Sequence, residues 1–251
     1  MTTQTVTVRA LDVLVRIAVG DPGLLPTIET AWHLCAADGD EPDTEVVLAD
    51  HDGSADSVAR SLQLLTQSVT LAAIGVRAGR DVMFHAGGLS NPRTGAAIAY
   101  VAPGGTGKTT VTTTLGRGRG YLSDETVAVT ADGAVVSYPK PLSVRRPDGV
   151  LKDETAPGAL GLAPACAEPW LAGVVVLRRD LAPGAPIDVV DVPLLDALVM
   201  VAPETSSLAR LTDPLRRLAD VVEMAGGLRV VHFAEARQLE PLVDEVLGSS
   251  R

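Results

Sequence analysis

The chain has 251 residues, of which 46% are hydrophobic and 21% are charged, a balance typical of a globular α/β protein and not of a disordered one. Its formal net charge of −10, with Lys and Arg scattered along the chain, argues against a nucleic acid partner. Apolar runs such as 174–177 are too short to span a membrane, and the start MTTQTVTV does not resemble a signal peptide. We therefore expect a cytoplasmic protein with no membrane partner.

The first third of the chain predicts strands and helices in turn. Apolar residues alternate over 11–19, which is the period of a strand, and a short helix is expected over 26–37. A second strand is expected at 45–49. From residue 57 to about 77 the apolar positions step by four and three, so a long amphipathic helix should run up to Gly79.

The middle of the chain predicts two strands that converge on a glycine-rich loop. The first strand covers 81–85 and is followed by the turn-rich segment GGLSNPRTG, and the second begins at 96. A short helix should begin near Lys108, and the runs YLSDETVAV and AVVSY predict a hairpin. The segment 148–169 shows no clear period and is expected to be a mobile loop region.

The last third predicts two strands, then two helices, then a strand and a helix. The strands are expected at 173–178 and 187–190. Asp191 and Asp213 are each followed by proline, so both are expected to cap helices, over about 193–201 and 214–225. A last strand at LRVVHF and a terminal helix carrying Leu239, Leu242, Val243 and Val246 follow.

No composition break demands a second domain. We therefore predict one domain over 1–251, with a lead-in at 1–82, a nucleotide-binding core at 83–146 and C-terminal strands and helices at 147–251. Cys35 and Cys166 are isolated, so we expect buried, reduced thiols.

The segment AAIAYVAPGGTGKT, residues 96–109, runs from an apolar strand into a phosphate-binding loop. It fits the P-loop pattern, although Ala102 stands where the strict pattern has its first glycine. Gly104, Gly105 and Gly107 are expected to take positive φ and turn backbone N–H groups toward an anion. The residues expected to contact a nucleoside triphosphate are Pro103, Gly104, Gly105, Thr106, Gly107, Lys108, Thr109 and Thr110.

Lys108 should supply a positive charge to the outer phosphates, and Thr109 a hydroxyl to Mg²⁺. A P-loop alone does not define the class of enzyme, which depends on a second, acidic element, and Asp124 with Glu125 is the best candidate. Neighbouring side chains in extended backbone point to opposite sides, so one acid of the pair should face the phosphates. Asp180 is a weaker candidate, and His85 closes the strand before the P-loop strand.

Four basic residues, Lys140, Arg145, Arg146 and Lys152, flank proline-rich segments. Arginine and lysine side chains could neutralise charge in phosphoryl transfer, but a solvent-facing position is the simpler expectation for each.

The ordered set of His85-Ala-Gly, a strand, APGGTGKTT, a short helix and Gly120-Tyr-Leu-Ser-Asp124-Glu125 resembles the core of the HPr kinase/phosphorylase family over about 83–146. The resemblance implies an α/β fold whose P-loop kinase core is similar to HPr kinase and phosphoenolpyruvate carboxykinase, a mixed sheet with flanking helices. It implies catalytic roles for His85, Lys108 and Asp124, with Asp124 as general base, and a metal site at Thr109 and Glu125. Glu125 departs from the family's Asp-Asp pair.

Together these observations predict a kinase that uses ATP and Mg²⁺ to phosphorylate a hydroxyl, most simply serine, of a peptide, protein or small molecule. The alternatives are a non-catalytic ATP-binding scaffold or sensor and a P-loop hydrolase. The acceptor, the choice of ATP over other triphosphates, phosphorylase activity and homo-oligomerisation stay open.

Overall fold

A computed structural model describes residues 4–39, 41–147, 149 and 151–250. The chain divides into two compact units, one formed by 1–77 with 138–160 and the other by 78–137 with 161–251. The segment 138–160 therefore packs with residues from the start of the chain. A single domain over 1–251 stays a prediction.

The N-terminal unit begins with a three-stranded sheet, β1 (Gln4–Ala10), β2 (Val13–Val19) and β3 (Thr44–Val47). Leu11 and Asp12, with φ of 50° and 60°, form a tight turn between β1 and β2, as hairpins with two positive-φ residues do. The prediction that a strand begins at Leu11 is wrong for this reason, and β1 was not predicted. The predicted strand at 45–49 is confirmed by β3.

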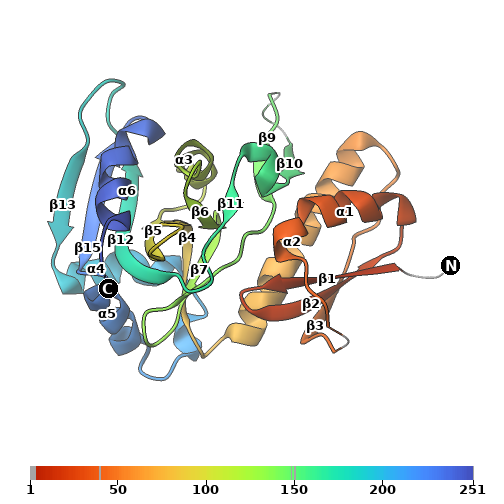
Figure 1. The fold of residues 1–251 in the computed structure, drawn as a ribbon, viewed down its shortest axis with the longest axis horizontal. Coiled ribbons are helices and arrows are strands. Elements are labelled where there is room, and N and C mark those ends of the chain that lie inside the picture. Colours follow the sequence, from red (N-terminus) through yellow and green to blue (C-terminus); the bar gives the residue numbers. More distant parts are fainter. Residues whose placement is uncertain (1–3, 40, 148, 150, 251) are drawn as a thin grey trace. The chain divides into compact units, whose positions relative to one another are not determined.

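Helices α1 (Leu25–Ala31) and α2 (Ala55–Arg77) pack against this sheet (Figure 1). The long amphipathic helix is confirmed by α2, and the helix predicted over 26–37 is shorter, because it ends in a 3-10 turn at His33–Cys35.

The predicted loop region 148–169 contains strands. β9 (Leu142–Arg145) pairs antiparallel with β10 (Lys152–Thr155), while residues 148 and 150 lie outside the described residues. The Glu154 carboxylate accepts hydrogen bonds from Thr66 in α2, at 2.8 Å, and from Ser143 in β9, at 2.6 Å. The loop prediction is wrong because β10 is held by pairing and hydrogen bonds to other segments, which leave no apolar period in its own sequence.

The second unit is built on a mixed sheet in the order β11-β6-β4-β5-β12-β15-β13 (Figure 1). These strands cover Ala163–Pro164, Gly120–Ser123, Val82–Ser90, Ala96–Val101, Trp170–Arg179, Leu228–Phe233 and Asp188–Val192, in the same order. β5, β12 and β15 are parallel, and β4 and β13 run antiparallel to their neighbours. Two short strands, β7 (Thr126–Val129) and β14 (Thr205–Ser206), also pair with β4, and β8 (Val135–Val136) pairs with β7. The predicted α/β class with a mixed sheet and flanking helices is confirmed.

Two pairs of helices cover the two faces of this sheet (Figure 1). One face packs against α3 (Lys108–Leu115) and α6 (Glu240–Leu247) through a cluster that includes Val111, Val175 and Val243. The other packs against α4 (Leu194–Val201) and α5 (Pro214–Met224) through a cluster that includes Val174 and Val201. Successive residues of β12 therefore alternate between the α3 face and the α4 face.

Two further sequence predictions in this unit are wrong. The glycines of GGLS, expected in a turn, continue β4 as far as Ser90, because only the small Gly87 leaves room for the Tyr100 ring of β5. Asp191 lies inside β13, and Asp213 holds the position before α5 without a capping hydrogen bond from its side chain.

Candidate active site

The glycine-rich segment 102–107 joins the end of β5 to the start of α3, as a strand–loop–helix arrangement for phosphate requires. Gly105 and Gly107 have φ of 86° and 106°, so only glycine fits these positions without strain. Gly104 does not have a positive φ, and that part of the prediction is wrong. Binding of phosphate by the N–H groups of this loop stays a prediction.

The Lys108 side chain folds back over the beginning of the loop. Its Nζ donates to the carbonyl oxygens of Ala102, at 2.5 Å, and Pro103, at 3.4 Å, and the residue is 7% exposed. Burial lowers the pKa of Lys108, and the carboxylates of Glu204, Asp124 and Glu125 act in the opposite direction. The ammonium is therefore held at the loop by backbone oxygens, and three acidic side chains favour its charged form.

Asp124, rather than Glu125, faces the first turn of α3. The Thr109 hydroxyl donates to Asp124 Oδ2 at 2.8 Å, and the Tyr121 hydroxyl donates to Oδ1 at 3.3 Å. Asp124 is 5% exposed and directly follows Ser123, the last residue of β6. The Asp124 carboxylate therefore lies at the beginning of α3, and the prediction that one acid of the pair faces bound phosphates stays a prediction.

His85 lies on β4 among charged residues of the same unit. Burial and the nearby Lys108 ammonium lower the pKa of His85, and the carboxylates of Glu125 and Glu204 and a hydrogen bond to the Glu125 backbone oppose this. The neutral imidazole is the favoured form.

Glu204 belongs to this group of residues, although nothing in the sequence indicated it. It precedes β14, whose Thr205 pairs with Phe84 of β4, and this pairing carries Glu204 to the neighbourhood of His85. β14 has only two residues, too few to show a strand period. Its pairing with β4, and with it the place of Glu204, therefore cannot be predicted from the sequence.

Asp180 and three of the four basic candidates have polar partners within their own units. Asp180, the weaker metal candidate, accepts a hydrogen bond from His232 Nδ1 at 2.9 Å or forms an ion pair with it when His232 is protonated. Lys140 is buried, at 1% exposure, so the solvent-facing expectation is wrong for it, and its Nζ donates to the Pro141 carbonyl. Arg146 pairs with Asp56 and Asp153. Lys140, Arg145, Arg146 and Lys152 all belong to the N-terminal unit.

The side chains at the loop provide few ligands for a metal. Throughout the described part of the chain, no three His, Cys, Asp or Glu side chains are grouped so that they could hold a metal ion. Thr109 and Asp124 present adjacent hydroxyl and carboxylate oxygens, which suit Mg²⁺, because this ion takes one or two protein ligands and completes its shell with phosphate oxygens and water. These two residues fit Mg²⁺ better than the predicted pair of Thr109 and Glu125.

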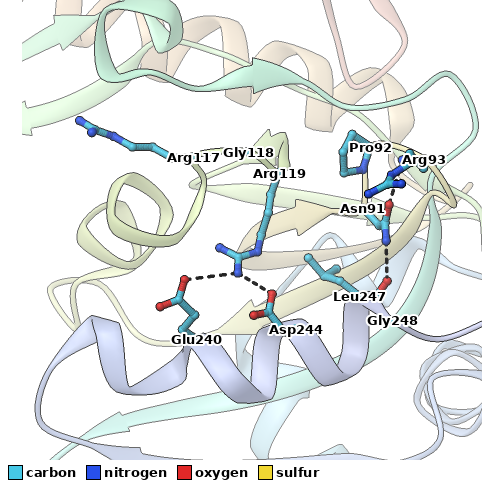
Figure 2. A pocket seen from close by; sticks show the side chains of 10 residues that line it. All are labelled: Asn91, Pro92, Arg93, Arg117, Gly118, Arg119, Glu240, Asp244, Leu247 and Gly248. Atoms are coloured by element: carbon cyan, nitrogen blue, oxygen red, sulfur yellow. Dashed lines mark hydrogen bonds and ion pairs between the residues drawn. The ribbon is translucent and has the colours of Figure 1, made fainter.

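A hollow of about 340 Å³ lies at the opposite edge of the sheet, beside the turn that precedes β5 (Figure 2). Arg119 lies in it between Asp244 and Glu240, with nitrogen–oxygen distances of 2.5 and 3.6 Å, and Arg117 points away from them. None of the predicted site residues lines this hollow, so we place the candidate active site at the glycine-rich loop and not here.

Comparison with known proteins identifies no family. No family model matches the chain, and no curated protein matches it. Among solved structures, the HPr(Ser) kinase/phosphatase from Coxiella burnetii is similar, with 11% sequence identity, a TM-score of 0.34, and coverage of 66% of this chain and 93% of that chain. At this TM-score it is a distant structural neighbour. None of the helices in the described part of the chain has the length and apolar character needed to cross a membrane.

Proposed function

We propose that the protein is a kinase that transfers the γ-phosphoryl group of ATP to a hydroxyl group. The observation that carries the proposal is the hydrogen bond from Thr109 Oγ1 to Asp124 Oδ2, at 2.8 Å. Thr109 lies in the first turn of α3, next to Lys108. A loop for phosphates, a cation beside it and a carboxylate at the same helix are the parts that phosphoryl transfer uses for positioning and for charge stabilisation.

The loop N–H groups and Lys108 would bind the triphosphate, and Thr109 and Asp124 would hold Mg²⁺. When bound, this ion neutralises negative charge on the phosphate oxygens. Both oxygens of Asp124 already accept hydroxyl hydrogen bonds, from Thr109 and Tyr121, which suits a ligand better than a proton acceptor. We therefore move the general base from Asp124, as expected from sequence, to Glu125.

In the proposed reaction the acceptor oxygen forms a bond to the γ-phosphorus as the bond from that phosphorus to the β–γ bridging oxygen breaks. ADP leaves, and the hydroxyl proton passes to the Glu125 carboxylate. The Glu125 carboxylate raises the pKa of both His85 and Lys108, so it lies near both side chains, and we propose that the acceptor approaches beside it. The neutral His85 can accept or donate a hydrogen bond to that acceptor.

The experiment follows the label from γ-labelled ATP in the presence of candidate serine peptides, proteins and small hydroxyl compounds. Glu125→Gln should lower transfer by about 10² to 10⁴, the range for loss of acid–base catalysis, with ATP affinity nearly unchanged. Asp124→Asn should weaken ATP binding in the presence of Mg²⁺ much more than in its absence. Asp180 is an exposed acid paired with His232, so Asp180→Asn is the matched control and should change neither phosphoryl transfer nor ATP affinity.

Each outcome selects one assignment. Full turnover in Glu125→Gln with loss of turnover in Asp124→Asn would return the role of base to Asp124. Label released as free phosphate without any acceptor would identify a hydrolase, and ATP binding with no transfer or release would identify a scaffold or sensor. For Lys108→Ala we expect weaker ATP binding by calorimetry, and an unchanged affinity would contradict the loop assignment.

A further inference from the structure

Arg179 is the last residue of β12 and lies at the same end of the parallel strands as the glycine-rich loop. β12 runs parallel to β5, with Val176 opposite Val101, so both strands have their carboxyl ends at this edge. Arg179 has the same parity in β12 as Val175 and Leu177, which pack on the α3 face. The guanidinium is thus on the face of the sheet where α3 begins.

Contacts to the backbone place the Arg179 side chain beside the loop. Its Nε donates to the carbonyl of Ala234 at 3.0 Å, which leaves the Nη1 and Nη2 donors for another partner. Nη1 lies 3.9 Å from the point where a Cβ on Gly107 would be. Among the residues that the structure describes, no carboxylate forms an ion pair with Arg179.

The charges at the loop show why a second cation is needed. The carboxylates of Glu204, Asp124 and Glu125 all act on the Lys108 ammonium, so three acidic side chains stand against one lysine on the β4 and β6 side of the loop. A triphosphate adds several more negative charges to the same place. One lysine does not balance this charge, and the Arg179 guanidinium, on the β12 side, is a second cation beside Gly107.

We infer that Arg179 binds the phosphate chain of the nucleotide, on the flank of the loop opposite the carboxylates. The inference rests on the proposed function, because it names a further residue for the same nucleotide. The free edge of a guanidinium presents two parallel donors, which match two phosphate oxygens better than an ammonium does. Arg179 would be a binding residue and take no part in proton transfer.

Arg178 provides a matched control. It neighbours Arg179 and is exposed as well, but it has the parity of Val174 and Val176, which pack on the α4 face. Removing either arginine changes the net charge of the protein by the same amount. A difference between the two variants therefore reports position, not total charge.

The test is calorimetric titration of ATP and ADP, with Mg²⁺, into the full-length wild type and the variants Arg179→Ala, Arg179→Lys and Arg178→Ala. Arg179→Ala should weaken both nucleotides about 10-fold or more, a typical effect for a charge-assisted contact. Arg179→Lys should lie between Arg179→Ala and the wild type, and Arg178→Ala should match the wild type. Thermal melts without nucleotide check that each variant is folded.

Equal affinities for Arg179→Ala and Arg178→Ala, in folded proteins, would overturn the inference. Loss of binding in Lys108→Ala with full binding in Arg179→Ala would overturn the role of Arg179 and leave the proposed function standing. If the wild type binds neither nucleotide, the proposed function fails first.

Discussion

Gly87 lies in β4 directly against the Tyr100 ring of β5, and the structure predicts a large cost for adding one methyl group there. A Cβ on Gly87 would lie 2.1 Å from Cε2, 2.5 Å from Cζ and 2.7 Å from the hydroxyl oxygen of Tyr100. Carbon atoms in good contact are about 3.5–4.0 Å apart, so the ring must move by more than 1 Å. Tyr100 is 1% exposed and its hydroxyl hydrogen-bonds to Thr112 of α3, so the ring has no free space.

Gly87→Ala should therefore lower the free energy of unfolding by about 3–5 kcal/mol, as the sum of overpacking and of a broken buried hydrogen bond. In a unit of this size the melting temperature should fall by roughly 10 °C. Calorimetry or denaturant unfolding measures both. Because Tyr100 and Thr112 connect β5 to α3, the variant should also disturb the loop between them.

A double-mutant cycle separates the steric cause from others. Gly87→Ala combined with Tyr100→Leu should recover at least about 1 kcal/mol relative to the sum of the single changes, because the clashing ring is gone. Tyr100→Phe keeps the ring and should not rescue. Gly104→Ala is the matched control, since a Cβ there meets nothing within 4 Å. A Gly87→Ala protein as stable as the Gly104→Ala protein would refute the packing argument.

Three further predictions follow from single residues. Gly75→Ala, at an exposed position inside α2 with nothing within 4 Å, should stabilise the protein by about 0.5–1 kcal/mol in denaturant unfolding. Burial raises the pKa of the Cys35 thiol to about 12, so iodoacetamide at pH 8 should label the half-buried Cys166 first, and Cys35 only after unfolding; mass spectrometry that finds Cys35 labelled in the native protein would contradict this. The pKa of His85 is lowered in the folded state, chiefly by burial, so the unfolded state takes up a proton first as pH falls below about 6.5. Stability should then be lost below that pH, and His85→Asn should lose less between pH 7.5 and 5 in thermal melts.

Features with a local period could be predicted from the sequence. The spacing of apolar residues in α2 and the strand–glycine–helix order around Lys108 depend only on neighbours along the chain, and both are present. The isolated cysteines are free, as expected, although only Cys35 is buried. Such signals persist because a helix face or a tight loop is set by residues that are close in sequence.

Features that depend on distant pairing could not be predicted. β10 is held by Glu154 through Thr66, which lies 88 positions away, and Glu204 reaches His85 only because β14 pairs with β4. The place of Arg179 beside the loop could not be predicted for the same reason, since it depends on which strand lies beside β5. The residue types in these segments carry no period that would distinguish them from solvated loops.

The orientation of the acidic pair shows how one strand determines this site. β6 and β7 both pair with β4, and the chain passes from one to the other at Asp124 and Glu125. The register shifts between Gly88 and Leu89, and the Ala86 N–H donates to the Glu125 carbonyl at 3.1 Å, so the backbone of the pair is fixed against β4. His85 lies on the same strand, one residue before Ala86. Because β4 positions both acids and the histidine, a change in its glycines should alter the acids, the histidine and the β5 loop together, whereas a change at Arg179 should alter only nucleotide binding.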